Sequence, residues 1–287
     1  MRTRFAPSPT GPLHIGHAFS ALLNFQAVQN GSGEFLLRIE DIDQTRSRKS
    51  WESQIFRDLE WLGLSWTKPV MRQSERIECY QNALQSLWAR GLLYPCSCKR
   101  KDILSAASAA NEGTPLSGPD GTVYPGTCRS KDPHSTALPQ GAALRLNIEA
   151  AFEAIADPAT LAFQEEGAGP NQETGAVSMD KDQAVTEIGD IVLARRDFGT
   201  SYHLSVVVDD AAQEITNIIR GQDLFQATHI HVLLQRLLSL PTPIYRHHRL
   251  IRDENGKRLA KRDDARSIDS YRQSGASAAH IRELIGL

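Results

Sequence analysis

A short segment near the amino terminus, R-F-A-P-S-P-T-G-P-L-H-I-G-H over residues 4–17, constrains the fold more than any other part of the chain. Residues 3–6 predict a short strand that prolines end, and the apolar spacing over 15–29 predicts a helix. A strand, a Gly/Pro turn and a helix start form an anion site, because free backbone N–H groups and the helix dipole point outward. His14 and His17 lie at this helix start, where imidazoles can donate to phosphate oxygens. The segment therefore predicts carboxylate attack on the α-phosphate of ATP, in which a preorganised donor contributes about 10²–10³ in rate.

The rest of the chain alternates short apolar runs with segments of helical spacing. Residues 35–39 predict a buried strand, and apolar residues recur at helical intervals over 51–62 and 77–87. The β-branched run 204–208, which two aspartates follow, is typical of a core strand in a parallel sheet. Residues 105–140 are rich in Ser, Ala, Gly, Thr and Pro, so we expect mostly loop there. The pattern predicts an α/β fold with a Rossmann-type parallel sheet.

Composition excludes several classes of protein. The 287 residues carry 32 Lys and Arg against 34 Asp and Glu, a net charge of −2, so the chain is no uniformly basic coat for nucleic acid. The charge is uneven: residues 148–190 hold ten acids and one Lys, whereas residues 246–262 hold seven Lys and Arg and two acids. The acidic stretch should face away from a polyanion. We find no membrane-length apolar run and no secretion signal, and three of the four cysteines lie within 96–128, which favours a metal site in a reducing cytoplasm.

The opening segment closely resembles the H-I-G-H signature of class I aminoacyl-tRNA synthetases, in the F-A-P-S-P-T-G-x-L-H-I-G-H form of the glutamyl-type enzymes. A bare pair of histidines three residues apart also occurs as a metal pair or on ordinary surfaces, so the longer string carries the resemblance. The resemblance implies a catalytic role for His14 and His17. It also implies that both histidines contact ATP, which we expect as its Mg²⁺ complex, together with Gly16, whose missing side chain leaves space for the base.

A second family signature, K-M-S-K-S or G-K-K-L-S-K-R in the glutamyl branch, is similar to G-K-R-L-A-K-R at residues 256–262. A mobile basic loop there would close over the triphosphate and offset the charge that moves onto pyrophosphate. Arg258 replaces the first lysine and keeps its charge but not its geometry, and Ala260 replaces the serine hydroxyl. Lys261 aligns with the second lysine, so we expect a catalytic Lys261 and ATP contacts from Arg258 and Lys261. On its own, such a heptamer is usually a solvated surface.

Glutamate carries two carboxylates and one ammonium, so a selective pocket needs cations for the first two and a carboxylate for the third. The resemblance supplies these groups at matching positions, with Glu40 in R-I-E-D-I-D for the ammonium and Tyr202 as a hydroxyl contact. It implies that Arg4 and Arg220, the latter in R-G-Q-D-L, clamp the carboxylates, and which arginine holds which carboxylate stays open. Without the motifs, each would be interpreted as an ordinary surface ion pair. From the first motif we expect the glutamate site to include Arg4, Phe5, Ala6, Pro7 and Ser8.

Cys96, Cys98 and Cys128 offer three soft metal ligands near a loop that has little else to order it. Tetrahedral zinc needs a fourth ligand, and chemistry alone favours His134. The pattern Y-P-C-x-C with Y-P-G-x-C resembles the zinc module of short glutamyl-type enzymes, which implies Tyr124 as the fourth ligand and leaves His134 as the alternative. We therefore expect one Zn²⁺ per chain, against the plainer interpretation of three buried or free thiols.

We expect four regions: a first catalytic half (1–93), an inserted zinc-binding, acceptor-like subdomain (94–183), a second catalytic half (184–250), and a K-M-S-K-S-like loop with a short helical region (251–287). Only 25 residues follow Arg262, too few for an independent anticodon-binding domain. The chain thus resembles the truncated paralogues of glutamyl-tRNA synthetase, the glutamyl-Q tRNA(Asp) synthetases.

That family activates L-glutamate with ATP and transfers it to the queuosine base in the anticodon of tRNA(Asp). The resemblance implies a cytoplasmic, tRNA-modifying ligase whose partners are ATP, L-glutamate and the queuosine-carrying anticodon stem–loop. We expect a monomer with no membrane partner. Three alternatives remain open: a minimal glutamyl-tRNA synthetase that charges a 3′ end, a nucleotidyltransferase with other acceptors, and a catalytically silent, zinc-stabilised RNA-binding module.

Overall fold

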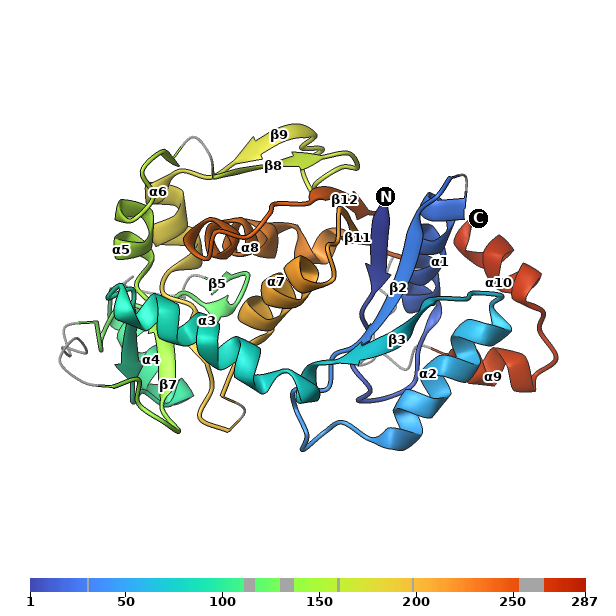
Figure 1. Ribbon diagram of the computed structural model, residues 1–287, viewed down its shortest axis with the longest axis horizontal. Helices are drawn as coiled ribbons and strands as arrows, with labels where there is room; N and C mark the ends of the chain where they lie inside the picture. Colours follow the sequence, from blue (N-terminus) through green and yellow to red (C-terminus); the bar gives the residue numbers. More distant parts are fainter. Residues whose placement is uncertain (30, 111–116, 130–136, 159–160, 198, 253–265) are drawn as a thin grey trace.

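The computed structural model in Figure 1 describes residues 1–29, 31–110, 117–129, 137–158, 161–197, 199–252 and 266–287. Within these ranges, no helix combines the length and the apolar character that a membrane span requires. The predicted second signature, residues 256–262, and the alternative zinc ligand His134 lie outside the described residues.

Strands from the amino-terminal part of the chain form one parallel sheet in the order β1-β2-β3. These strands are β1 (Arg2–Phe5), β2 (Glu34–Ile39) and β3 (Thr67–Arg72), with α1 (Ile15–Gln29) and α2 (Lys49–Trp61) between them. The predicted first strand, first helix and second strand are therefore confirmed. The right-hand part of Figure 1 shows this unit, with α1 against β1 and β2.

A second sheet, in the order β11-β12-β8-β9, continues the parallel core. Its strands are β11 (Asn217–Gly221), β12 (Ile244–His248), β8 (Ala162–Glu165) and β9 (Gly175–Ser178), of which only β9 is antiparallel to its neighbour. The N–H of Thr216, just before β11, donates to the carbonyl of Arg2 at 3.0 Å. The two sheets therefore meet edge to edge at β1 and β11, and the predicted parallel α/β core is confirmed.

The prediction of a strand at residues 204–208 was wrong. This run lies inside helix α7 (Tyr202–Ala212), whose first turn is capped by the Ser201 hydroxyl accepting the N–H of Leu204. The helix packs against α3 (Ile77–Ala89) and α8 (Phe225–Leu237), and seven of its eleven residues are buried, so its apolar residues are not confined to one stripe. A short apolar run of this kind does not distinguish a buried strand from a buried helix.

A smaller antiparallel sheet, β10-β7-β4, stands at the left of Figure 1 and carries the cysteine-rich segment. It consists of β4 (Leu93–Cys96), β7 (Ala143–Leu146) and β10 (Val192–Ala194), and beside it lie α4 (Arg100–Ala110) and the hairpin of β5 (Ser117–Gly118) and β6 (Gly121–Thr122). The expectation of loop over 105–140 was thus wrong for the end of α4. The sheets also do not follow the proposed division at residue 183, because β8 and β9 extend the catalytic sheet and β10 belongs to the inserted one.

The remaining elements are α3 (Ile77–Ala89), α5 (Ile148–Glu153), α6 (Lys181–Gln183), α9 (Ile268–Gln273), α10 (Ala278–Ile285), a π-helical turn (Ala184–Ile188) and 3₁₀ turns at Gln73–Glu75 and Gln222–Leu224. Two main hydrophobic cores result. One lies under α3, α7, α8 and the inserted sheet, and the other joins α1, α2 and the first sheet to the carboxyl-terminal helices. Buried Ile281 and Ile285 hold α10 to this second core, and α10 contacts α1.

Candidate active site

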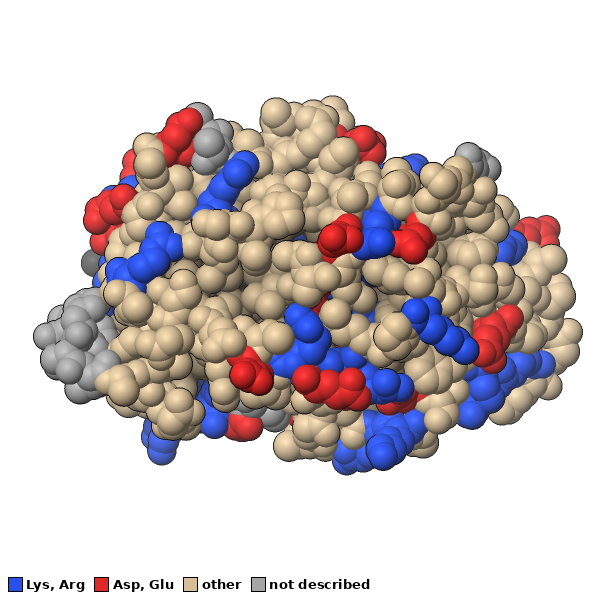
Figure 2. Space-filling view, viewed as in Figure 1, with Lys and Arg blue, Asp and Glu red and all other residues tan. Residues whose placement is uncertain are grey.

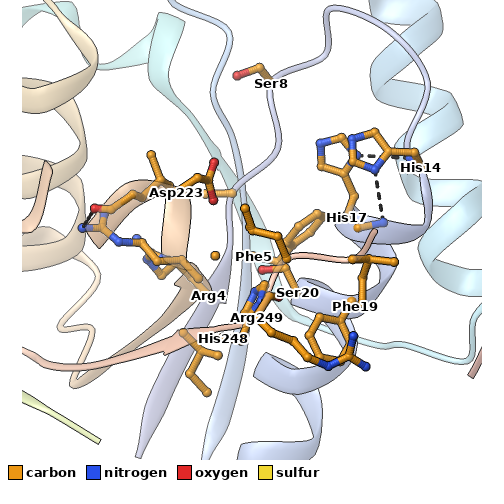
Figure 3. A pocket seen from close by; sticks show the side chains of 18 of the residues that line it. Arg4, Phe5, Ser8, His14, His17, Phe19, Ser20, Asp223, His248 and Arg249 are labelled. Atoms are coloured by element: carbon orange, nitrogen blue, oxygen red, sulfur yellow. Dashed lines mark hydrogen bonds between the residues drawn. The ribbon is translucent and has the colours of Figure 1, made fainter. Parts of the chain in front are cut away.

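A pocket of about 350 Å³ opens at the carboxyl ends of β1, β2 and β11, beside the start of α1 (Figure 3). The predicted site residues that line it are Arg4, Phe5, Ala6, Ser8, His14, Gly16, His17, Glu40, Tyr202 and Arg220. Pro7 does not line the pocket; its carbonyl instead accepts the N–H of Glu40 at 3.0 Å. Arg258 and Lys261 lie outside the described residues. The structure thus brings together residues that lie far apart in the sequence.

The two histidines of the H-I-G-H segment stand side by side at the amino end of α1, with ring centroids 3.8 Å apart (Figure 3). Nδ1 of His17 accepts the N–H of His14, and Nδ1 of His14 accepts the N–H of Gly16, both at 3.1 Å. A neutral imidazole whose Nδ1 is an acceptor carries its proton on Nε2. Both rings can therefore donate from Nε2 beside the helix terminus, the geometry that phosphate oxygens require.

Arg4 and Arg38 share the carboxylate of Asp210 under the floor of the pocket. Arg4 donates from Nε and Nη2 at 3.0 and 3.2 Å, and Arg38 donates from Nη1 at 2.8 Å. Burial favours the neutral acid, but Arg4 and Arg38 together hold the pKa of Asp210 below its usual range. Arg4 therefore enters the pocket with its charge already paired.

Glu40 lies against this network, with Oε1 at 3.4 Å from Arg38 Nη2 and its side chain 11% exposed. Burial raises the pKa of Glu40 above its ordinary value, although Arg38 and Arg4 counteract the rise. A ligand ammonium would stabilise the charged form of such a carboxylate. The position of Glu40 is thus consistent with the predicted ammonium contact.

The neighbouring Asp209 also lies near Arg38, at 4.0 Å, but its hydrogen bonds go to other partners and anchor α7. Its carboxylate accepts hydrogen bonds from Gln73 Nε2 at 2.9 Å, Arg76 Nε at 2.6 Å and the Tyr80 hydroxyl at 2.9 Å. Asp209 is fully buried, so these three donors replace the water that a carboxylate otherwise needs. The sequence carried no signal for this anchor beyond the two adjacent aspartates.

Arg220 differs from Arg4 in its partners. Its Nε donates to His247 Nε2 at 3.2 Å, Nη1 lies 3.1 Å from His231 Nδ1, and Nη2 donates to the Leu224 carbonyl at 3.2 Å and the Thr228 hydroxyl at 2.7 Å. Among the residues that the structure describes, no carboxylate lies within 4.0 Å of this buried guanidinium. Four of its five N–H donors are used, which leaves one on Nη1 for a ligand.

Among the pocket residues that the sequence analysis gave no role, three are ionisable. Asp223 belongs to the R-G-Q-D-L motif, His248 is the last residue of β12, and Arg249 follows it. The His248 ring meets the edge of Phe19 at 4.9 Å, and the Arg249 guanidinium lies over the same ring at 4.9 Å (Figure 3). Arg249 lies in the basic stretch 246–262, but only the sheet topology places it in the pocket.

A second cavity of about 800 Å³ adjoins the first, between the inserted sheet and the catalytic core. The two cavities share Tyr202, Asp223 and Leu224, and the inserted region contributes Arg100 and Asp120. On the face shown in Figure 2, acidic side chains gather at the end that carries α5 and α6, where the acidic stretch 148–190 lies.

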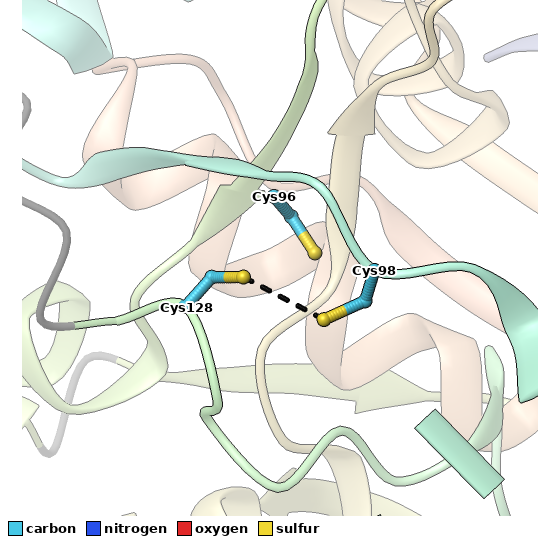
Figure 4. Close-up of side chains that lie close together, drawn as sticks. All are labelled: Cys96, Cys98 and Cys128. Carbon is cyan, nitrogen blue, oxygen red and sulfur yellow. Dashed lines mark hydrogen bonds between the residues drawn. The ribbon is translucent and has the colours of Figure 1, made fainter. Parts of the chain in front are cut away.

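The three clustered cysteines converge, with their sulfur atoms within 4.8 Å of one another (Figure 4). The Tyr124 hydroxyl lies 3.5 Å from Cys96 Sγ and 3.4 Å from Cys98 Sγ, and it accepts the N–H of Cys128 at 2.9 Å. Burial opposes ionisation of Cys128, but hydrogen bonds from Tyr124 and from the Ser97 backbone lower the pKa of its thiol to about 6. Three sulfurs and one phenol oxygen thus form a compact set of four donors.

A strand–turn–helix with two Nε2 donors, set on a parallel sheet beside buried arginines, agrees with the class I synthetase catalytic core that the H-I-G-H segment predicted. A family model described as the catalytic domain of class I tRNA synthetases (E and Q) matches residues 1–287, so the chain belongs to this family and is an enzyme of the tRNA synthetase type.

Similarity to individual proteins supports the same family. The chain is 55% identical to the glutamyl-Q tRNA(Asp) synthetase of Rhodobacter capsulatus, over all of both chains. It is 37% identical to that of Albidiferax ferrireducens, over 99% of this chain and 91% of the other. Among solved structures, a glutamate tRNA ligase from Elizabethkingia meningosepticum in complex with its amino acid matches with a TM-score of 0.67 and 26% identity. The match covers 92% of this chain and 52% of that one, so the chain spans about half the length of this ligase.

Proposed function

We propose that this enzyme activates L-glutamate with ATP and transfers the glutamyl group to the queuosine base in the anticodon of tRNA(Asp). The observation that carries the proposal is Arg220, a buried cation without a carboxylate partner among the described residues, in a pocket that also holds the paired histidines. The 55% identity to a glutamyl-Q tRNA(Asp) synthetase supports the choice of acceptor.

In the first step, an α-carboxylate oxygen of glutamate attacks the α-phosphorus of ATP, and the bond to pyrophosphate breaks. Nε2 of His14 and of His17 donate to the phosphate oxygens on which charge develops. ATP enters as its Mg²⁺ complex, and Arg258 and Lys261 would offset the charge on pyrophosphate. The products are glutamyl-adenylate and pyrophosphate.

Glutamate is held by groups from β1, the end of β2, α7 and β11. Arg220 binds one carboxylate, Arg4 contacts the other, Glu40 takes the ammonium and the Tyr202 hydroxyl completes the contact. An amide in place of the side-chain carboxylate leaves a buried cation unpaired, so this pocket rejects glutamine. Phe5, Ala6 and Ser8 line the same space.

In the second step, a hydroxyl of the cis-diol on queuosine attacks the carbonyl carbon of the adenylate, and AMP leaves. We place the modified base in the cavity that adjoins the pocket at Tyr202, Asp223 and Leu224, because the activated carboxyl group would form in the pocket beside it. Arg249, from the basic stretch 246–262, lines the first pocket, whereas Asp190 of the acidic stretch 148–190 borders the second cavity. We therefore expect the RNA phosphates on the Arg249 side. These substrates place the enzyme in the cytoplasm.

We further propose one Zn²⁺ bound by Cys96, Cys98, Cys128 and Tyr124. The donor set fits, because three thiols and one phenol lie within mutual contact and one of the thiols ionises readily. Burial raises the pKa of the Tyr124 phenol, and the Arg145 guanidinium 3.8 Å from its ring centroid would favour the phenolate. The ion would join the end of β4 to the residues around Tyr124 and Cys128.

The test is to incubate the protein with ATP, labelled glutamate and an isolated anticodon stem–loop, with and without queuosine. We expect label only on the queuosine-carrying stem–loop, at a site that periodate oxidation of the diol destroys. If that stem–loop stays unlabelled while full-length tRNA is charged at its 3′ end, the minimal-synthetase alternative is correct. Absence of any glutamate-dependent pyrophosphate exchange would favour the silent RNA-binding module.

A further inference from the structure

The space behind Arg220 contains a carboxylate that reaches the arginine only through an imidazole. Glu165, at the end of β8, lies with Oε2 2.5 Å from Nδ1 of His247 on β12, and both side chains are 0% exposed. Its other oxygen accepts the backbone N–H groups of His247 and Gly167, each at 2.8 Å. The far side of the His247 ring, Nε2, is 3.2 Å from Arg220 Nε.

The direction of this relay follows from which atoms can donate. The Nε of Arg220 is only a donor, so His247 Nε2 must accept. The proton of the neutral ring is then on Nδ1, where it is donated to the Glu165 carboxylate. Burial favours the acid form, but the hydrogen bonds from His247 and Gly167 keep the pKa of Glu165 below its ordinary value, so the acceptor is charged.

The backbone is shaped to permit this contact. A Cβ on Gly167 would lie 2.3 Å from the carbonyl oxygen of His247 and 2.9 Å from Oε1 of Glu165, so only glycine lets the end of β8 approach β12 so closely. The Tyr245 ring lies parallel to the His247 ring, at an interplanar angle of 4°, and fixes its plane from β12 itself.

We propose that Glu165 and His247 are positioning residues for substrate glutamate, acting through Arg220. The relay orients the guanidinium and balances its charge from a distance, so the face that opens on the pocket keeps full affinity for a substrate carboxylate. Arg4 offers the contrast, since Asp210 occupies its donors directly. This inference rests on the proposed function, because it assigns Arg220 to glutamate.

The decisive variant is Glu165→Gln, which keeps the shape of the side chain but replaces one carboxylate oxygen with an NH₂ group that donates hydrogen bonds. If its amide oxygen accepts the two backbone N–H groups, its NH₂ faces His247 Nδ1 and forces the ring proton to Nε2, against Arg220 Nε–H. If the amide flips, NH₂ instead meets the two backbone N–H groups. Either way one buried donor faces another donor, an arrangement that costs about 1–3 kcal/mol, or roughly five- to 150-fold in an equilibrium constant.

The measurement is glutamate-dependent ATP–pyrophosphate exchange, with tRNA(Asp) present. For Glu165→Gln we expect the KM for glutamate to rise about tenfold or more, with the KM for ATP within about twofold of the wild type. Thr228→Val, which removes the hydroxyl that contacts both Arg220 and His247, should raise the same KM severalfold. The control is Asp58→Asn, an equally buried carboxylate on α2, bonded to Gln54 at 2.7 Å, which should leave both KM values unchanged.

A folded Glu165→Gln protein whose KM for glutamate stays within twofold of the wild type would overturn the relay, as would an equal rise in both KM values. If Glu165→Gln does not fold, Thr228→Val decides, and an unchanged KM for glutamate then overturns the inference. Failure of the proposed function is distinct, because the wild type itself would then show no glutamate-dependent exchange.

Discussion

The active-site pocket and the cysteine cluster are ordered in different ways. In and around the pocket, key side chains are held by partners distant in the sequence, as Arg4 is by Asp210 and His247 is by Glu165. In the cluster, three cysteines and Tyr124 lie within residues 96–128 and contact one another through sulfur at 3.4–3.5 Å. Thiols form only weak hydrogen bonds, so these contacts hold the cluster together weakly. The pocket is therefore preorganised by the fold itself, whereas in the cluster the proposed zinc would join the ligands.

The largest loss of activity should follow substitution of the histidines at the start of α1. We expect His14→Ala or His17→Ala to lower kcat for adenylate formation by about 10²–10³, because their donors act mainly in the transition state. The KM for glutamate should change little. Steady-state pyrophosphate exchange measures both quantities, and an unchanged kcat with weaker substrate binding would contradict a preorganised phosphate site.

The next largest effects should come from substitutions of the two buried arginines, and these effects should differ. Arg220→Met should lower kcat/KM for glutamate about 10²-fold and erode discrimination against glutamine, since a buried charge pair with substrate is worth about 2–5 kcal/mol. Arg4→Met should also erode discrimination, but it additionally breaks a buried ion pair and should lower the free energy of unfolding by about 3 kcal/mol. Full discrimination in either variant would refute the role of that arginine, and chemical denaturation provides the stability comparison.

Stability should depend on pH through a histidine under the catalytic sheet. Burial among aromatic rings lowers the pKa of His229 from 6.5 to about 4, so between these values the unfolded chain binds a proton that the folded protein does not. Stability is therefore lost as the pH falls from 6.5 towards 4, by up to about 3 kcal/mol from this residue. Denaturation curves should show a shallower pH dependence in His229→Asn than in the wild type, and no change in His280→Asn, which alters a half-exposed ring on α10.

The smallest effect on activation should follow metal removal. Cys98→Ser should abolish binding of the single zinc equivalent yet leave glutamate-dependent exchange within about threefold, because no cysteine lines the pocket. Transfer to the stem–loop should suffer more, since the inserted region borders the second cavity. Elemental analysis and both assays test this, with Cys79→Ser, an exposed thiol outside the cluster, as the control. Loss of activation equal to that of His14→Ala would show that the two regions are not independent.

The sequence predicted correctly those parts of the site that lie within short motifs. The segment 4–17 predicted the strand, the turn and the helix, and ten of the assigned site residues line one pocket. The segment 204–208 failed, because a helix buried on most sides has the same apolar run as a core strand, and only the Ser201 cap distinguishes it. Glu165 was missed because nothing local marks it, whereas Asp223 lies in R-G-Q-D-L and was simply given no role.

The amino-acid order specifies which chemical groups are present: imidazoles beside a helix start, arginines and a glutamate in recognisable motifs, and thiols at metal-ligand spacing. Local conformation fixes these, since a turn and a helix terminus depend on a few adjacent residues. The tertiary structure alone decided the charge state and availability of each group. Arg4 and Arg220 are both buried arginines, yet one meets Asp210 and the other meets the acceptor nitrogen of His247. That difference arises because β11 pairs with β12 and β12 pairs with β8. The second pairing joins Glu165 to Tyr245, more than 70 residues later in the sequence, and no local pattern predicts such a contact.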